Sequence, residues 1–228
     1  MSWAEVFKIN KNMKRSIDEQ LQDMKFQPIR VITANTTYTP EKTGLYKIIC
    51  VGKGGNGYGD NNSPQTKGVA GGGGGVSIKI ARLTKGSSCN VTVGTTASFV
   101  SGSISLSATA GGDGGWNTTS AVGGSGTGGD YNYTGETGTY TTEHYKSPTG
   151  GSVGVYISDL HRQMTGVLTL GLDDDRDKPV AVMYTMGRGI LSFGGGGTGA
   201  GYVEYGYGGV SINGQPAAVL IIPIEMEE

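Results

Sequence analysis

The sequence predicts an all-β fold: a β-sandwich or jelly-roll-like body that carries extended, polyglycine-type loops and follows a short N-terminal helical segment. Two observations predict this fold. Stretches of alternating apolar residues recur about every ten residues in the first half of the chain, as is typical of sandwiches and barrels. Glycine supplies 43 of the 228 residues, against an ordinary share of about 7 %.

The first 28 residues are predicted to form a helical segment that attaches or oligomerises the chain. Ser2 with Glu5, and Ser16 with Glu19, have the spacing of capping boxes. The apolar stripe from Met13 to Met24 has helical spacing but covers under two heptads, which is too short for a stable isolated coiled coil. An ordinary surface helix and a docking element are both compatible with this pattern. The apolar residues are Trp3, Val6, Phe7 and Ile9, followed by Met13, Ile17, Leu21 and Met24.

Residues 29–228 are predicted to form one glycine-rich β domain. The apolar run at residues 217–224 predicts a final core strand, in which Pro223 confines the last residues to an edge or a bulge. Residues 35–44 are predicted to be a turn-rich connector, and residues 153–191 an insertion with a small β structure of its own. The other strands are expected at residues 29–33, 45–51, 76–83, 89–93 and 103–110.

The glycine tracts lie between the early strands and the final strand. If the final strand pairs with the early ones, the tracts must begin and end near the same place. Extended chains without Cβ atoms can approach closely, as collagen shows. We therefore expect the tracts to pack as ordered, polyglycine-type layers rather than to act as free linkers.

Composition narrows the possible functions. Charged residues form 16 % of the chain and the net charge is −1, whereas nucleic-acid binding needs clustered Lys and Arg. No apolar run approaches the roughly 18 residues of a membrane span, and no signal-peptide pattern is present. We expect no nucleic acid, no membrane insertion, synthesis in a cytoplasm, and buried free thiols at Cys50 and Cys89.

No motif predicts a catalytic, cofactor or metal site. The G-x-G-x-x-G match at residues 52–57 follows a strand, but no helical pattern comes after it to hold a pyrophosphate. Asp173, Asp175 and Asp177 alternate as in a calcium loop, but Lys178 stands where that loop needs glycine. We therefore expect a protein that is not an enzyme and that needs no cofactor.

A succession of motifs gives the chain a resemblance to a known class. SWAEVFKIN at residues 2–10 opens it, GLYKIICVG at 44–52 runs into glycines, and the glycines at 71–75 lead into VSIKI at 76–80. This order resembles the glycine-rich domain of bacteriophage and prophage tail-fibre, tail-tip and related virion proteins. The resemblance is strong at residues 1–10, 44–94 and 194–224 and weak over 153–191.

The resemblance implies a homotrimer on the virion, assembled in the cytoplasm of the host bacterium. It implies an N-terminal attachment segment, for which we predict Trp3, Val6, Phe7 and Ile9, and a distal surface that meets the host cell. The expected function is a non-enzymatic tail-fibre or tail-tip adhesin that contacts other tail, baseplate or collar proteins. The alternatives are a purely structural collar, head-fibre or baseplate component and, as a separate class, a depolymerase of surface glycans with paired carboxylates.

Aromatic residues in the glycine-rich middle are the candidates for receptor binding. Tyr, Ser, Gly and Asn are the residues of adaptable recognition loops, because flat rings contribute contact area at low entropy cost. We expect the partner to be a host cell-surface glycan or protein. Packing of the same rings against the glycine layers is the alternative interpretation. The predicted receptor-binding residues are Trp116, Tyr131, Tyr133, Tyr140 and Tyr145.

Overall fold

The computed structural model describes residues 29–59, 68–115, 119–141 and 213–227, together with residues 150, 151, 153, 193, 194 and 196. All regular structure in these ranges is strand, which confirms the all-β prediction. The predicted helical segment and almost all of the predicted insertion lie outside the described residues. The strands are β1 (Arg30–Ile32), β2 (Thr36–Tyr38), β3 (Gly44–Val51), β4 (Tyr58–Gly59), β5 (Gly68–Val69), β6 (Val76–Leu83), β7 (Cys89–Val93), β8 (Ala97–Ser101), β9 (Ile104–Ala108), β10 (Gly126–Thr127), β11 (Tyr131–Tyr133), β12 (Tyr140–Thr141) and β13 (Ala218–Met226).

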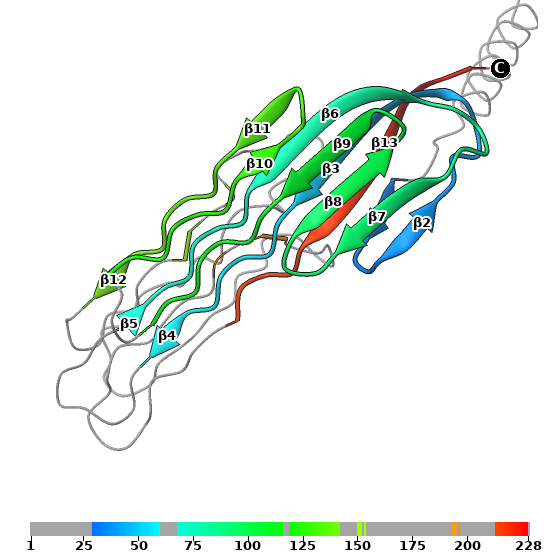
Figure 1. The fold of residues 1–228 in the computed structure, drawn as a ribbon. Helices are drawn as coiled ribbons and strands as arrows, with labels where there is room; N and C mark the ends of the chain where they lie inside the picture. Colours follow the sequence, from blue (N-terminus) through cyan, green and yellow to red (C-terminus); the bar gives the residue numbers. More distant parts are fainter. Residues whose placement is uncertain are drawn as a thin grey trace, which may run out of the picture.

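Two antiparallel sheets form a sandwich-like body. Sheet A has the strand order β1-β13-β3-β6-β11, and sheet B has the order β10-β9-β8-β7-β2. A third, small sheet with the order β12-β5-β4, which we call the tip sheet, lies at the far end of the molecule from the C-terminal end of β13 (Figure 1). The molecule is therefore elongated, with the sandwich at one end and the tip sheet at the other.

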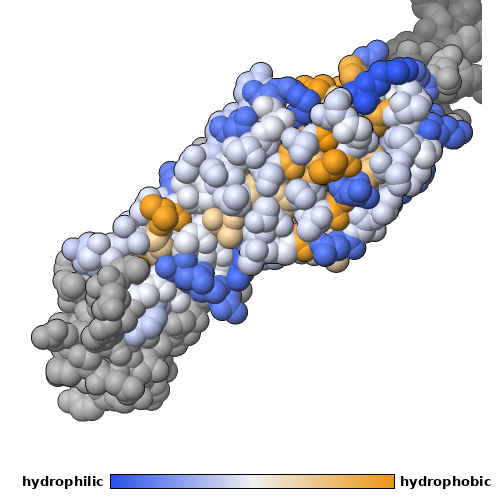
Figure 2. Space-filling view, in the orientation of Figure 1, coloured by the Kyte–Doolittle hydropathy of each residue, from blue (hydrophilic) through white to orange (hydrophobic). Residues whose placement is uncertain are grey.

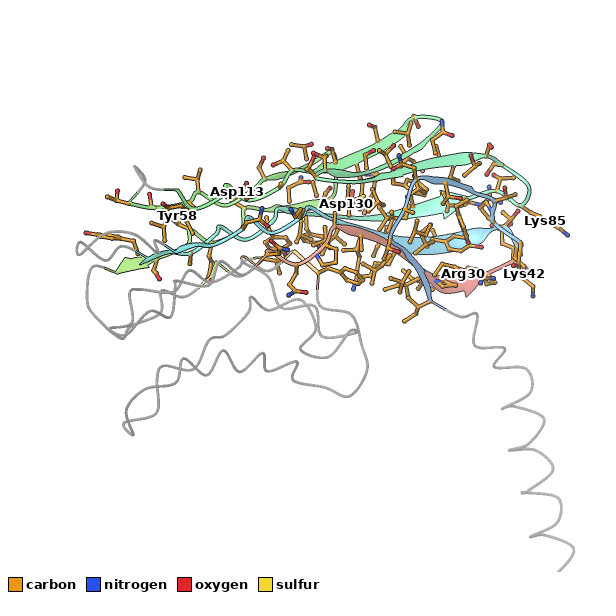
Figure 3. All side chains as sticks on the ribbon, turned by 90° about the horizontal axis from the view of Figure 1, so that it is seen from below. Arg30, Lys42, Tyr58, Lys85, Asp113 and Asp130 are labelled. Atoms are coloured by element: carbon orange, nitrogen blue, oxygen red, sulfur yellow. The ribbon has the colours of Figure 1, made fainter. Side chains whose placement is uncertain are left out.

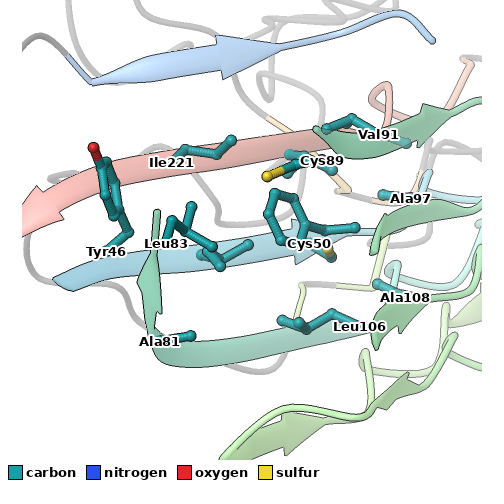
Figure 4. Packing of buried hydrophobic residues seen from close by; sticks show 14 residues of the cluster. Tyr46, Cys50, Ala81, Leu83, Cys89, Val91, Ala97, Leu106, Ala108 and Ile221 are labelled. Carbon is teal, nitrogen blue, oxygen red and sulfur yellow. The ribbon is translucent and has the colours of Figure 1, made fainter. Parts of the chain in front are cut away.

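The core between the two sheets follows from the alternation of each strand. Tyr46, Ile48 and Cys50 point from β3 into this core, and the residues between them point to the outer face of sheet A. Facing side chains come from β7, β8 and β9 of sheet B (Figure 4). The two cysteines are buried and free, which confirms that prediction. The buried core residues are Tyr46, Ile48, Cys50, Ala81, Leu83, Cys89, Val91, Ala97, Phe99, Leu106, Ala108, Ala217, Val219 and Ile221.

Strand β13 closes sheet A, as the sequence predicts for the final apolar run. It lies between β1 and β3, with Leu220 opposite both Val31 and Ile49. The register shifts between Pro223 and Glu225, because proline has no N–H to donate to the ladder. The sequence predicts an edge or a bulge at Pro223, and the structure has an irregularity of register there.

The loop between β10 and β11 joins the two sheets at one edge of the sandwich. β10 pairs with β9 of sheet B, whereas β11 pairs with β6 of sheet A. The buried Ser77 of β6 donates a hydrogen bond from Oγ to the carbonyl of Thr127 at 2.8 Å. Asp130 in the loop accepts hydrogen bonds from Lys79 Nζ at 2.7 Å and from the backbone N–H of Ile80 at 2.9 Å.

The structure differs from the sequence prediction in its short strands. The expected connector at residues 35–44 contains β2, which pairs with β7 at the edge of sheet B. β8 was not predicted, although it pairs with both β7 and β9. Two of the three residues of β2 are threonines and two of the five residues of β8 are serines, so pairing with neighbours, rather than a local apolar pattern, determines where they form.

Candidate recognition surface at the glycine-rich end

The region between the sandwich and the tip sheet consists of extended chains that run side by side (Figure 1). We call them the glycine segments: residues 52–57, 70–75, 109–115, 119–125 and 134–139, with residues 150–151, 194, 196 and 213–217. Their backbones are joined by hydrogen bonds between segments that are far apart in the sequence. The buried N–H and C=O groups of the glycines thus find partners without forming a sheet.

Segment 70–75 lies in the middle of this region. Among the described residues, it exchanges backbone hydrogen bonds with six other segments. The distances between nitrogen and oxygen lie between 2.6 and 3.0 Å. The bonds include one with each of the six segments: Gly55 N to Gly72 O, Gly72 N to Gly112 O, Gly73 N to Glu136 O, Gly124 N to Gly73 O, Gly74 N to Gly194 O and Gly151 N to Gly71 O.

The direction of these hydrogen bonds repeats every three residues. Gly72 and Gly75 both donate to segment 109–115, while Ala70 and Gly73 both donate to segment 134–139. In a β-strand the direction of the backbone polar groups repeats every two residues instead. A chain with three residues per turn instead points its polar groups in three directions, as in the polyproline II helix.

Close approach of backbones explains why these positions are glycine. A Cβ built on Gly71, Gly74 or Gly111 would overlap the backbone carbonyl of another segment, well inside the 3.0 Å limit of real Cβ contacts. Among the described glycines, φ is positive only at Gly86, Gly102, Gly128 and Gly194. At most positions in the glycine segments, glycine is needed because a side chain has no space there, and not because glycine can adopt a positive φ.

Two tyrosines flank a valine in the tip sheet. Tyr58 of β4 and Tyr140 of β12 are each paired with Val69 of β5. Directly paired residues of neighbouring strands point to the same face, and two strand spacings separate the tyrosine backbones by about 10 Å. Tyr140 is 50 % exposed, whereas Val69 is fully buried. The tip therefore presents two aromatic side chains on one face.

Side-chain hydrogen bonds hold the chain next to Tyr58. The backbone N–H of Asn56 donates to Asp113 Oδ1 at 2.6 Å. Asn56 Oδ1 accepts from the N–H of Gly214 at 3.1 Å and from Lys53 Nζ at 3.4 Å. Asn56 thus connects three segments close to the tip. Tyr58 and Asp113 lie at the opposite end of the molecule from Arg30, Lys42 and Lys85 (Figure 3).

The predicted receptor-binding residues are not brought together. Tyr140 lies in the tip sheet, whereas Tyr131 and Tyr133 lie on β11 at the edge of the sandwich (Figure 1). Tyr131 is 60 % exposed, but Tyr133 is partly buried and packs against the outer face of sheet A. Trp116 and Tyr145 lie outside the described residues, as do Trp3, Val6, Phe7 and Ile9.

Tyr58 is not among the predicted binding residues, although it is paired with the same valine as Tyr140. The sequence feature that marks Tyr58 is its position directly after the G-x-G-x-x-G match, as an aromatic residue among mostly small and polar ones. Figure 2 shows the glycine-rich region as mostly pale, with one small hydrophobic and one hydrophilic patch near its far end. Of the two tyrosines of the tip sheet, Tyr140 is exposed and Tyr58 is partly buried.

The titrating groups with raised pKa values lie in the sandwich rather than at the tip. Burial raises the pKa of Tyr38 to about 12, and it raises the pKa of the Cys50 thiol to about 12 as well. In the part of the chain that the structure describes, no group of three or more metal-ligating side chains occurs. The same part contains no helix with the length and apolarity of a membrane span.

Comparison with known proteins does not connect this geometry to a family. No family model matches the chain, and a search of the curated proteins finds no match either.

Proposed function

We propose that the chain is a non-enzymatic bacteriophage virion protein, a tail-fibre or tail-tip adhesin whose glycine-rich end binds the host cell surface. One observation carries this proposal. The glycine segments hold the tip sheet away from the sandwich, opposite the end where the chain enters β1 and leaves β13 (Figures 1 and 3). An attachment end and a distal end are thereby separated along the length of one molecule.

The glycine segments, in this proposal, form a polyglycine-type bundle at the end of a jelly-roll-like sandwich. The three-residue repeat of their hydrogen bonds and the lack of space for Cβ atoms support this assignment. At about 3.1 Å per residue, the chain from Gly52 to Gly59 extends about 20 Å from the sandwich. Such a bundle supports a small tip without a hydrophobic core, because backbone hydrogen bonds hold its chains together.

The tip sheet is the proposed place of recognition. Tyr58 and Tyr140 offer two aromatic side chains on one face, with a spacing of about 10 Å between their backbones. Tyrosine combines a flat apolar ring with a hydroxyl and loses little entropy on binding. These properties suit a host cell-surface glycan or an exposed protein loop. Trp116 and Tyr145 remain predicted contributors, and Tyr131 is a second exposed tyrosine on the sandwich.

The remaining parts of the proposal concern assembly. The chain acts as a homotrimer in the virion, assembled in the host cytoplasm, and contacts other tail, baseplate or collar proteins. Trp3, Val6, Phe7 and Ile9 attach it to the particle. Nucleic acid and membrane insertion have no part in this function.

A cell-binding assay tests the proposal. The fluorescently labelled protein is incubated with a panel of bacterial strains, and bound protein is measured by flow cytometry. We expect saturable binding to a subset of strains, lost when Tyr58→Ala and Tyr140→Ala are combined. Val122→Ala is the matched control, because Val122 is an exposed side chain of the glycine segments.

Each outcome of this assay has a definite meaning. Loss of binding in the double variant, with an unchanged unfolding midpoint, supports recognition by the tip. If the double variant binds fully and Tyr131→Ala does not, the recognition surface lies on the sandwich edge instead. Absence of binding to all strains, together with a collar or head position in a virion map, supports a purely structural role.

A further inference from the structure

The outer face of sheet A has a covered half and an open half. In the covered half, next to the glycine segments, Ile49, Val51 and Val76 are fully buried and pack with Val153 and Phe193. The open half lies toward the other end of the same strands. We define it by the exposed residues Ile29, Val31, Leu45 and Ile80, with the partly buried Ile222 among them.

The register of sheet A places these apolar residues together. Ile222 and Ile80 are both paired with Lys47, and Val31 is paired with Leu220. The residues therefore lie on one face across β1, β13, β3 and β6. Lys47 lies between Ile222 and Ile80 on this face, and Leu45 is paired with Arg82 and Glu225. The open half is therefore a group of apolar residues crossed by charged ones, whereas exposed apolar residues that occur singly are ordinary. Val100 is an exposed apolar residue of sheet B, away from this face, and is paired with Asn90 and Ser105.

The position where the chain enters the sandwich identifies the occupant of this face. Residues 1–28, outside the described residues, lead directly into Ile29, which itself belongs to the open half. Met13, Ile17, Leu21 and Met24 follow at steps of four, four and three, the spacing of one helix face. A stripe this short is not stable as an isolated helix in water and needs a surface to pack on.

The distance along the chain favours the chain's own segment over a second copy. Only residues 25–28 separate Met24 from Ile29, and four extended residues span at most about 14 Å. A tether of this length gives an effective concentration in the millimolar range, which a separate molecule does not reach in dilute solution.

We propose that the open half of sheet A is the docking surface for residues 13–24 of the same chain. Met13, Ile17, Leu21 and Met24 cover Ile29, Val31, Leu45 and Ile80, so that both apolar surfaces leave water together. Trp3, Val6, Phe7 and Ile9 stay available for a different contact. This docking does not depend on host-cell binding, and the two proposals can fail separately.

Limited trypsin digestion of the full chain tests the docking. Lys14 and Arg15 lie inside the proposed docked stretch, and cleavage after them requires that the stretch leaves the sheet. Ile80→Glu places a carboxylate in the open half, and Leu21→Glu places one in the segment. We expect either variant to speed this cleavage by about tenfold or more, because the rate follows the population of the open form.

The matched control is Val100→Glu. Val100 is 40 % exposed and Ile80 is 49 % exposed, and both are outward-facing positions in strands. Val100→Glu is expected to leave the cleavage rate unchanged. The unfolding midpoint is measured for each variant, and Leu21→Glu keeps the test valid if Ile80→Glu does not fold, because Leu21 is not one of the residues of the described sheets.

Two results overturn the proposal. Equal cleavage rates in the wild type, Ile80→Glu and Leu21→Glu mean that residues 13–24 do not dock on this face. A wild-type cleavage rate that falls as the protein concentration rises, with a matching increase of mass in light scattering, assigns the face to a second copy. A rate independent of concentration and raised by both glutamates is the result that supports docking within one chain.

Discussion

The backbone N–H of Gly72 donates to the carbonyl oxygen of Gly112 at 3.0 Å. Beside this bond, Gly111 lies so close to the carbonyl of Gly72 that no Cβ fits between them, whereas a Cβ on Gly112 would lie 3.4 Å from Val122 O. Of these two adjacent glycines, Gly111 has no space for a side chain, whereas Gly112 has space for a methyl group.

Ser77→Ala is expected to destabilise the sandwich by about 1–2 kcal/mol, because it removes the donor of the part-buried hydrogen bond to the carbonyl of Thr127. Ser77 is fully buried and its Oγ bonds to Thr127 O and lies 3.0 Å from Asn132 Oδ1. Urea unfolding measures the change. The control is the exposed Ser105→Ala, and an equal, negligible effect of both substitutions contradicts the role given to Ser77.

Tyr133→Ala is expected to cost about 1–3 kcal/mol of unfolding free energy, and Tyr131→Ala well under 1 kcal/mol. Tyr133 packs on the apolar outer face of sheet A, whereas Tyr131 is 60 % exposed. Thermal unfolding followed by circular dichroism distinguishes them. If Tyr131 proves the more costly of the two, the exposed tyrosine has a packing role that the structure does not give it.

Alkaline pH is expected to destabilise the protein between about pH 10 and 12. The pKa of Tyr38 is raised from 10.0 to about 12 by burial first and by the neighbouring Tyr46 next. Because the unfolded state loses the proton at the lower pH, the contribution is complete below pH 10 and disappears as pH rises toward 12. Tyr38→Phe should make the free energy of unfolding fall less steeply over this range; an unchanged slope contradicts the assignment.

The thiol of Cys50 is expected to resist alkylation in the folded protein. Burial raises its pKa from 9.0 to about 12, so the reactive thiolate is scarce at neutral pH. Iodoacetamide should modify Cys50 only as fast as the protein unfolds, and mass spectrometry of peptides detects the product. Rapid modification under native conditions contradicts the buried position of Cys50.

Most of the sandwich strands could be predicted because their apolar residues either alternate or form a continuous run. Cys89 and Val91 of β7 and the apolar run of β13 carry that signal in the sequence. β8, β10 and β12 carry little of it, because they are short and contain serine, threonine or glycine. Their positions depend on partners from distant parts of the chain, which a local pattern does not report.

The candidate site could be predicted only in part for a related reason. The sequence identifies Tyr140 as a tyrosine in a glycine-rich region, but its neighbour across Val69 depends on the register of three short strands. The sequence pattern therefore does not identify Tyr58. Tyr131 and Tyr133 lie in a similar composition, yet the pairing of β11 with β6 places them on the sandwich.

The most direct test compares Gly111→Ala with Gly112→Ala in urea unfolding. The packing of backbones predicts a loss of about 2–3 kcal/mol for Gly111→Ala, since its Cβ has no space beside Gly72. It predicts a change between zero and a gain of about 1 kcal/mol for Gly112→Ala, because alanine restricts the unfolded chain. Equal effects of the two substitutions would contradict the close backbone packing of the glycine segments.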